Sequence, residues 1–184
     1  MNLTNHTYFN LSGNGSRRIT EHYLHLSCDQ YLPVDSTQIP TGEIRNCVGS
    51  AFDFNSDVDV VAGTSHGVLL GDRIPHVDGG GQPGFDHCFV VNGNSELRHA
   101  ATLTDELSGR QLIVSTTSPG IQVYTCNFLS SDQTLAPFVQ HNAVCLETQQ
   151  FPDAINQPLF PNCVIRPGDR YESTTVFAFG NVNL

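Results

Sequence analysis

The chain has 184 residues, enough for one sizeable domain with its own hydrophobic core. Its 8 basic and 18 acidic residues give a net charge of −10, and so acidic a chain is repelled by phosphate backbones, which argues against a nucleic-acid partner. No apolar run approaches the roughly 18 to 20 residues that a membrane span needs, so we expect no membrane partner.

Alternation of apolar and polar residues predicts strands at several places along the chain, because successive side chains of a strand point to opposite faces. The clearest runs are residues 24–28, 111–116, 121–124 and 176–179. Turn signals separate them at residues 12–15, 107–110 and 166–169. No stretch shows a sustained 3.6-residue apolar pattern with caps. The sequence therefore predicts an all-β fold, a mostly antiparallel β-sandwich.

Two segments are less regular. Residues 36–84 are rich in Gly, Asp, Pro and Ser, and their last part, 78–84, must be a loop that delivers residues 85–87 to the mouth of a strand. Residues 147–161 contain three prolines, which cannot donate to a strand ladder, so we expect an ordered loop that crosses a sheet edge. We find no internal repeat or linker and interpret residues 1–184 as a single domain.

His6 is the first candidate for chemistry. A lone histidine is more often structural than catalytic. The residues around this one, Asn5, Thr7, Tyr8 and Asn10, all carry hydrogen-bonding side chains, which is an unusual density for a core strand. Histidine changes charge near neutral pH, so a histidine in such surroundings is suited to proton transfer.

Glu147 is the second candidate. Alone, it is typical of a solvated carboxylate at the end of a strand. It follows the apolar run 143–146, however, which would carry it into the interior. A desolvated carboxylate has a raised pKa and becomes a more useful base.

Two further polar residues stand out. Asp86 follows the glycine-rich loop and is by itself an ordinary turn residue. Gln122 interrupts an apolar strand and needs hydrogen-bond partners, which a carbohydrate can supply because an amide both donates and accepts. We interpret His87, next to Asp86, as a packing or orienting residue.

The spacing of cysteines and histidines indicates no metal site. The chain has six cysteines without a Cys-x-x-Cys pair and eight histidines without a His-x-x-x-His pair. Glycine-rich nucleotide loops and a nucleophile elbow are also missing from the sequence. We therefore expect no metal and no cofactor. Without a signal peptide, we expect a cytoplasmic protein with reduced cysteines, most of them buried.

Four stretches together resemble the galactose mutarotase (aldose 1-epimerase) family. They read Asn-His-Thr-Tyr-Phe-Asn-Leu at 5–11, Phe-Asp-His at 85–87, Pro-Gly-Ile-Gln-Val-Tyr at 119–124 and Leu-Glu-Thr-Gln at 146–149. The first differs from the family motif only by Thr in place of Ser. The resemblance covers essentially the whole chain and implies the family's β-supersandwich. A weaker match at 39–43 is interpreted as structural, with Glu43 outside the site.

The resemblance implies a catalytic pair that opens a sugar ring without a cofactor. Glu147 would be the general base that removes the proton from the anomeric hydroxyl. His6 would be the general acid that protonates the ring oxygen. The implied activity is that of an aldose 1-epimerase, which interconverts the α and β anomers of aldohexoses such as galactose and glucose.

The resemblance also implies how the sugar is held. The implied substrate-binding residues are His6, Thr7, Tyr8, Asp86, Gln122 and Glu147. The usual chain of the family extends beyond this one on the N-terminal side, where it supplies an arginine, another histidine and strands that complete the sandwich. We therefore expect an N-terminally truncated sandwich with exposed edges and apolar surface.

Two alternatives remain open at this point. A non-catalytic sugar-binding module, or an inactive truncated isoform, would keep Asp86 and Gln122 but lose turnover. A relative that acts on hexose 6-phosphates would need basic residues for the phosphate. The chain has only eight Lys and Arg residues, and none adjoins the site motifs, which disfavours this second alternative.

Overall fold

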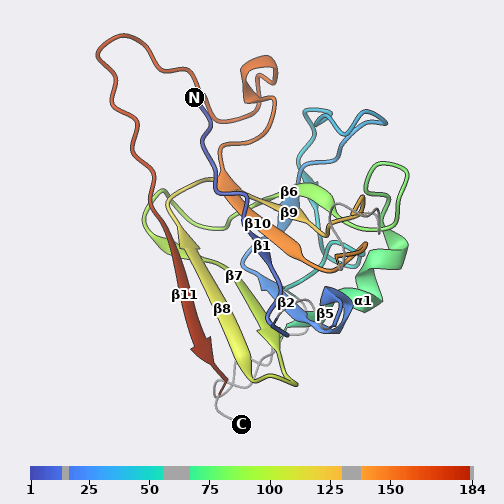
Figure 1. Ribbon diagram of the computed structural model, residues 1–184. Helices are drawn as coiled ribbons and strands as arrows, with labels where there is room; N and C mark the ends of the chain where they lie inside the picture. The colour runs from blue at the N-terminus through green and yellow to red at the C-terminus, as the bar shows by residue number, and fades with distance from the viewer. Residues whose placement is uncertain (14–16, 56–66, 130–137, 183–184) are drawn as a thin grey trace.

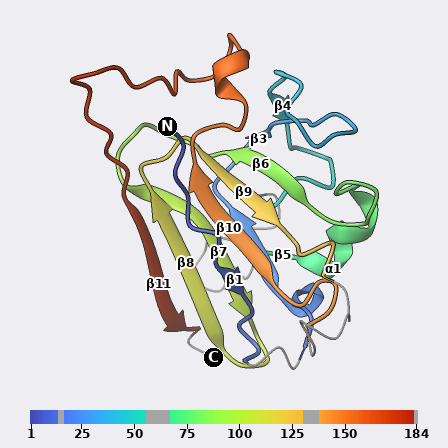
Figure 2. The same cartoon turned by 45° about the horizontal axis from the view of Figure 1, so that its top comes forward.

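Two antiparallel sheets pack face to face in the computed structural model, which describes residues 1–13, 17–55, 67–129 and 138–182 (Figures 1 and 2). The six-stranded sheet has the strand order β1-β10-β9-β6-β3-β4, and the five-stranded sheet has the order β11-β8-β7-β2-β5. The predicted all-β class and antiparallel β-sandwich are thereby confirmed.

The strands are short, and helix is confined to single turns in the part of the chain that the structure describes. The six-stranded sheet contains β1 (Tyr8–Phe9), β3 (Gln30–Tyr31), β4 (Arg45–Asn46), β6 (Asp86–Val90), β9 (Gly120–Tyr124) and β10 (Val144–Gln149). The five-stranded sheet contains β2 (Tyr23–Leu26), β5 (Val68–Leu69), β7 (Arg98–Asp105), β8 (Arg110–Thr116) and β11 (Thr175–Asn181). The helical turns are α1 (Leu70–Arg73), η1 (Ile19–Glu21), η2 (Ile74–His76) and η3 (Ala154–Asn156). None of the described helices is long and apolar enough to span a membrane.

The hydrophobic core lies between the two sheets, because every second side chain of each strand faces the partner sheet. Its members from the six-stranded sheet include Phe89, Ile121, Val123, Val144 and Leu146, and those from the five-stranded sheet include Leu24, Leu26, Leu103, Leu112 and Val114. Burial of one such side chain stabilises the fold by about 1.5–3 kcal/mol. The same alternation leaves the intervening residues of β9 and β10 on the outer face of the six-stranded sheet.

The predicted turns agree with the structure where it describes them. They are the β7–β8 hairpin at 107–110, the loop 78–84 and the turn at 166–169. In the hairpin, Gly109 has a φ of +70°, which favours glycine. In the last turn, the amide of Asp169 donates to the carbonyl of Arg166 at 2.9 Å. The predicted turn at 12–15 includes residues 14 and 15, which lie outside the described residues.

One predicted loop boundary was wrong. The loop expected at 147–161 begins later, because β10 continues through Gln149, which pairs with Gly120 of β9. The first proline of the segment is Pro152, so the ladder is complete before proline interrupts it. Glu147 therefore lies within a strand that is hydrogen-bonded on both sides, by β1 and β9, and not in a loop.

A predicted strand was also too long. The alternation at 24–28 predicted a strand as far as Cys28, but β2 ends at Leu26, which pairs with Ala101 of β7. β7 carries an irregularity between His99 and Ala101, and the ladder to β2 stops at that point.

All six cysteines are free, and five of them are buried: Cys28, Cys47, Cys88, Cys126 and Cys145. Their predicted burial as small apolar side chains is thereby confirmed. Cys163 is partly exposed. None of these positions is held by a covalent cross-link, so packing between the sheets carries the fold.

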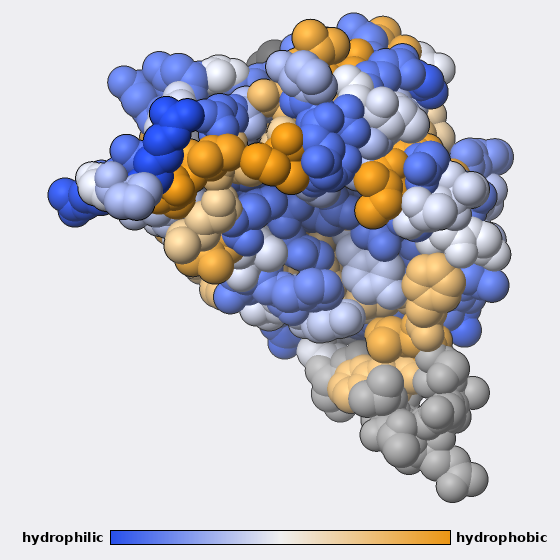
Figure 3. All heavy atoms as spheres, turned by 90° about the horizontal axis from the view of Figure 1, so that it is seen from above, coloured by the Kyte–Doolittle hydropathy of each residue, from blue (hydrophilic) through white to orange (hydrophobic). Residues whose placement is uncertain are grey.

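Some apolar side chains reach the surface. The edge strand β11 exposes Val176 and Phe179, the latter to 67%. Seen from above, the molecule shows separate hydrophobic patches within a largely hydrophilic surface (Figure 3). An edge strand with exposed apolar side chains offers both unpaired backbone groups and apolar area to another chain segment.

His22 ties the N-terminal segment to the five-stranded sheet. Its ring is fully buried, and its Nε2 accepts a hydrogen bond from the amide of Leu11 at 3.0 Å. Burial disfavours the charged imidazolium and lowers the pKa of His22 to about 4. The fold therefore requires this histidine to be neutral.

We expect His22 to make the protein lose stability in weak acid. The pKa of His22 in the folded protein, about 4, lies below the unfolded value of 6.5. The contribution of the neutral ring to the free energy of unfolding is therefore complete above about pH 6.5, and it declines by up to about 3 kcal/mol as the pH falls toward 4. In His22→Gln, the amide oxygen still accepts from Leu11 but cannot titrate. The unfolding temperature of this variant should drop less than that of the parent between about pH 7.5 and about pH 5. Equal drops in the unfolding temperatures of the two proteins would show that His22 does not cause the pH dependence of stability.

Candidate functional site

The outer face of the six-stranded sheet carries a row of side chains from four neighbouring strands. The register pairs Tyr8 with Cys145, Cys145 with Tyr124, and Tyr124 with Asp86. Directly opposed residues in a sheet point to the same face, so these four side chains lie beside one another. The row therefore runs across the sheet from the N-terminal strand β1 to β6.

A second row lies two residues further along the same strands. Glu147 of β10 pairs with Gln122 of β9, and both point to the same face as the first row because the side-chain period of a strand is two. His6 stands two residues before Tyr8, and the register of β1 with β10, continued by two residues, places it opposite Glu147. Residues more than 100 positions apart in the sequence thus come together.

The N-terminal segment that carries His6 runs along β10 (Figure 2), and side-chain hydrogen bonds hold it there. β1 itself is only two residues long. Ahead of it, the Thr4 hydroxyl donates to the carbonyl of Thr148 at 3.0 Å. The side chain of Asn2 both donates to the carbonyl of Gln150 (3.0 Å) and accepts from its amide (2.9 Å). These bonds take the place of a backbone ladder and fix His6 against the sheet.

His6 and Glu147 are in direct contact. Nε2 of His6 lies 3.3 Å from Oε1 of Glu147. The Glu147 side chain is 9% exposed and that of His6 is 50% exposed, so the pair joins a buried carboxylate to a ring open to solvent. The His6 ring also stacks on Tyr8, with centroids 5.2 Å apart, and meets Tyr124 edge-on at 6.3 Å. Two tyrosine rings therefore lie against the His6 ring.

Asp86 and Gln122 form a second polar pair beside the first. Nε2 of Gln122 donates to Oδ1 of Asp86 at 2.8 Å. Oε1 of Gln122 is buried and has no hydrogen-bond partner among the described residues. A buried polar atom without a partner is costly, so this oxygen provides an acceptor that a ligand hydroxyl can satisfy.

A glycine two residues before β6 positions Asp86. Gly84 has a φ of +133°, and a Cβ there would collide with the side chains of Asn127 and Thr125. The same two side chains bind the next residue, because the Phe85 amide donates to Oγ1 of Thr125 (2.8 Å) and Nδ2 of Asn127 donates to the Phe85 carbonyl (3.0 Å). The chain entering β6 is thus fixed on both sides, which sets the direction of Asp86.

Burial strengthens both carboxylates as bases. It raises the pKa of Glu147, with a further increase from the charge of Asp86 and an opposing decrease from His6. Burial also raises the pKa of Asp86, against the hydrogen bond from Gln122 and the charge of His6. Tyr124 is affected in the same way, since burial raises its pKa to about 12. The site thus holds two negative groups close together with little water to separate them.

Of the residues singled out in the sequence, the structure brings together His6, Tyr8, Asp86, Gln122 and Glu147. Thr7 has a different environment, because both its amide (3.1 Å) and its hydroxyl (2.6 Å) donate to the side chain of Asn5. The structure therefore gives Thr7 a local bond within the motif and leaves it outside the two aligned rows.

His87 and Glu43 lie apart from this group. The His87 ring is buried and meets the rings of Phe52 and Tyr31 edge-on at 4.9 and 6.3 Å. Burial lowers its pKa to about 4, so it packs as a neutral ring. Glu43 is exposed and pairs with Arg45 at 2.7 Å. Both placements agree with the packing and structural interpretations given to these residues.

The sequence reasoning missed Tyr124 and Cys145, which lie in the first row. The signal was present as a spacing of two, since Tyr124 follows Gln122 by two residues and Cys145 precedes Glu147 by two. On a strand, this spacing places both residues on the same face as the polar residue already identified. Cys145 is fully buried next to Cys126 and Ala143 in a small apolar cluster at the base of the row.

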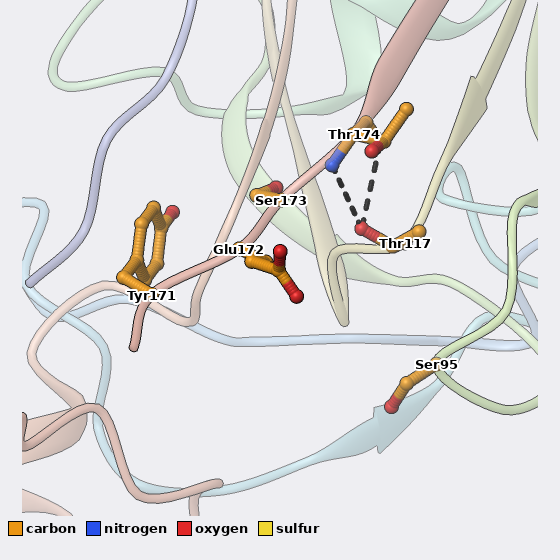
Figure 4. A pocket seen from close by; sticks show the side chains of 6 residues that line it. All are labelled: Ser95, Thr117, Tyr171, Glu172, Ser173 and Thr174. Carbon is orange, nitrogen blue, oxygen red and sulfur yellow. Dashed lines mark hydrogen bonds between the residues drawn. The ribbon is translucent and has the colours of Figure 1, made fainter. Parts of the chain in front are cut away.

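A separate groove of about 650 Å³ lies near the start of β11 (Figure 4). It is lined by Ser95, Thr117, Tyr171, Glu172, Ser173 and Thr174. Oγ1 of Thr117 accepts a hydrogen bond from the amide of Thr174 at 3.0 Å, as drawn in Figure 4. The groove contains none of the residues predicted for the site and has no paired acid and base of the kind found at His6 and Glu147.

Comparison with known sequences identifies related proteins. The sequence model of the family described as aldose 1-epimerase matches residues 1–178. The chain is 45% identical to galactose mutarotase of Homo sapiens over 184 residues, covering 97% of this chain and 49% of that protein. It is 32% identical to aldose 1-epimerase of Escherichia coli, covering 97% of this chain and 50% of that protein. The chain thus spans about half the length of the curated relatives it matches.

Solved structures show the same fold. An aldose epimerase homologue from C. elegans superposes with a TM-score of 0.81 at 29% identity, over 100% of this chain and 52% of that chain. A galactose 1-epimerase from Lactobacillus acidophilus superposes with a TM-score of 0.70 at 27% identity, over 99% of this chain and 49% of that chain. The two-sheet sandwich described above is therefore that of the galactose mutarotase-like structures.

The contact between His6 and Glu147 predicts a measurable coupling. His6 lowers the pKa of the Glu147 carboxyl, so His6→Asn should raise that pKa above its value in the parent protein. The carboxyl carbon of Glu147 can be titrated by nuclear magnetic resonance. His76→Asn is the matched control, because His76 is also exposed but lies in η2, away from the site. An unchanged Glu147 titration in His6→Asn would mean that the two groups are not coupled.

Proposed function

Because the chain belongs to the aldose 1-epimerase family, whose sequence model spans residues 1–178, we propose that it takes part in the interconversion of α and β anomers of an aldose. The observation that carries the proposal is the 3.3 Å contact between His6 Nε2 and Glu147 Oε1. Ring opening of a cyclic sugar needs a base at the anomeric hydroxyl and an acid at the ring oxygen. A histidine and a buried carboxylate in reach of one ring supply both.

The proposed reaction starts from the ion-paired state of the two groups. Glu147 takes the proton of the anomeric hydroxyl while protonated His6 gives its proton to the ring oxygen, and the C1–O5 bond breaks. The product is an open-chain aldehyde, neutral His6 and protonated Glu147. Rotation about C1–C2 presents the other face of the carbonyl, and the same transfers in reverse close the ring as the other anomer. Atoms and charges are balanced, and neither an oxidant nor a cofactor is consumed.

Asp86 and Gln122 would hold the sugar during the rotation. Their mutual hydrogen bond leaves the second carboxylate oxygen of Asp86 and the buried Oε1 of Gln122 as acceptors for sugar hydroxyls. Holding the remaining hydroxyls confines the motion to C1 and keeps the reacting atoms next to the acid and the base. Tyr8 and Tyr124 flank His6 and would form walls of the pocket.

The charge of the site favours a neutral sugar over a sugar phosphate. Glu147 and Asp86 are both acidic, and they lie close enough that the charge of Asp86 raises the pKa of Glu147. A phosphate group brought to this face would meet negative charge. We therefore propose a free aldohexose, such as galactose or glucose, as the substrate, in keeping with the names of the relatives.

The catalytic proposal predicts that Glu147→Gln loses anomer interconversion and keeps sugar binding. The amide retains the shape of the side chain but cannot accept the proton, and one positioned proton transfer contributes roughly 10² to 10⁴ in rate. Polarimetry of freshly dissolved α-D-galactose measures the rate above the spontaneous reaction. Glu43→Gln makes the same chemical change at an exposed residue outside the site and should match the parent.

His6→Asn should reduce the rate by a similar factor, because it removes the acid. Parent-like rates in both His6→Asn and Glu147→Gln would exclude the proposed roles. The half-length of the chain relative to its curated relatives supports a second outcome. If the parent binds galactose but does not accelerate the reaction, the chain is a sugar-binding protein.

Asp86→Ala tests binding separately from proton transfer. The substitution removes hydroxyl contacts that exist in both the ground state and the transition state, so KM should rise, whereas Glu147→Gln should act mainly on kcat. Titration of galactose into each variant, followed by calorimetry, gives the affinity directly. Unchanged galactose affinity in Asp86→Ala would remove this residue from the binding site.

A further inference from the structure

Three potential metal ligands meet at the site, although no spacing in the sequence indicates them. Within the described part of the chain, a ring nitrogen of His6, Sγ of Cys145 and a carboxylate oxygen of Glu147 all lie within 4.8 Å of one another. They come from two segments, the chain ahead of β1 and the strand β10. The grouping therefore exists only because these segments lie side by side.

The strand geometry explains the grouping. Cys145 and Glu147 are two residues apart on β10 and face the same side of the sheet. His6 lies across from Glu147 and is held there by the side-chain bonds of the N-terminal segment. The His6 nitrogen and the Glu147 oxygen of the second row therefore lie next to the Cys145 sulfur of the first row.

The distance between two of the three ligand atoms already suits a tetrahedral ion, and the third atom lies nearby. In a tetrahedral zinc site with usual bond lengths, a histidine nitrogen and a carboxylate oxygen are about 3.3 Å apart, and either one is about 3.6 Å from a cysteine sulfur. The observed distance between His6 Nε2 and Glu147 Oε1 is 3.3 Å. Sγ of Cys145 lies within 4.8 Å of the other two ligand atoms, so it must approach by no more than about 1.2 Å.

The donor set selects the kind of ion. Magnesium and calcium prefer oxygen ligands, whereas a thiolate with an imidazole selects zinc and related transition metals. Three protein ligands leave a fourth position open, as in zinc sites that bind water or another small molecule. Asp86 adds a second negative charge beside Glu147, which favours a cation at this place.

Access is from the side of the histidine. The Cys145 and Glu147 side chains are buried at the base of the site, while the His6 side chain is half exposed. An ion can therefore reach the Cys145 sulfur and the Glu147 carboxylate when the half-exposed His6 ring moves aside. Cys145 needs no oxidation or cross-link for this role, because its free thiol releases its proton to solvent when the metal binds the sulfur.

We infer that the protein binds Zn²⁺ through His6, Cys145 and Glu147. The ion engages both the base and the acid proposed for anomer interconversion, so zinc and sugar exclude each other. This exclusion rests on the proposed function, whereas the binding of the ion does not. Zinc would then act as an inhibitor at the site, not as a cofactor.

Cobalt(II) is the probe for the ligand set. Added to the chelator-treated full chain, Co²⁺ should give the charge-transfer absorption of a cobalt–thiolate bond and the intense visible bands of a tetrahedral ion, and Zn²⁺ should displace it. Cys145→Ser should abolish the charge-transfer band. Cys163→Ser removes the partly exposed thiol outside the site and should leave the band unchanged. Absence of the band in the parent, or its loss in Cys163→Ser, would overturn the inference.

Zinc affinity tests the other two ligands. His6→Asn should weaken Zn²⁺ binding at least about 100-fold, because loss of an outer-shell partner alone reduces zinc affinity by roughly 10- to 100-fold. His6 is half exposed, so this variant should fold even if Cys145→Ser does not. Glu147→Gln should weaken binding similarly, and Glu43→Gln should leave it unchanged. Parent-like zinc affinity in His6→Asn would reject the site.

Competition with sugar separates the two proposals. Saturating galactose should raise the apparent Kd of Zn²⁺, and Zn²⁺ should suppress any acceleration of mutarotation that is measured with a chelator present. Zinc binding that galactose does not change would overturn the exclusion and leave the ligand set intact. Mutarotation without zinc binding would overturn the metal inference and leave the proposed function intact.

Discussion

The antiparallel register of β1, β10, β9 and β6 is the constraint on which the site depends. It places Tyr8, Cys145, Tyr124 and Asp86 in one row of the outer face, and Glu147 with Gln122 in the next. A shift by one residue in any of these pairings would turn its polar side chains into the core. Because alternate residues of the same strands form the core between the sheets, the packing that stabilises the fold also holds the site in register.

The site combines burial with negative charge, and this combination determines what it can bind. Glu147 and Asp86 are poorly hydrated and repel each other, and only part of this is offset by His6 and the Gln122 amide. The buried Oε1 of Gln122 adds an unsatisfied acceptor. The outer face thus presents two largely buried carboxylates and an unpaired amide oxygen, all of which are acceptors. The hydroxyl donors of a sugar and the positive charge of a metal cation would each offset these acceptors, which is why we propose both ligands for the same face.

Several features of the fold could be predicted from the sequence because they depend on local chemistry. The alternation at 111–116 and 121–124 identified β8 and β9, and the glycines at 109 and 168 marked turns. The loop predicted from residue 147 began too early, because the prolines that motivated it act only from Pro152 onward. The ladder to β9 and β1 decides that Glu147 belongs to a strand, and strand pairing between distant segments leaves no local signal.

The sequence by itself determined which side chains are the candidates for chemistry: His6, Asp86, Gln122 and Glu147 each stand out by type, by neighbours and by their place in recognisable motifs. Only the tertiary structure decided that His6 Nε2 lies 3.3 Å from Glu147, and that Cys145 completes a set of three donor atoms with them. The physical reason is that periodicity fixes the face on which a residue lies within its own strand, whereas the pairing of strands more than 100 residues apart fixes which faces meet.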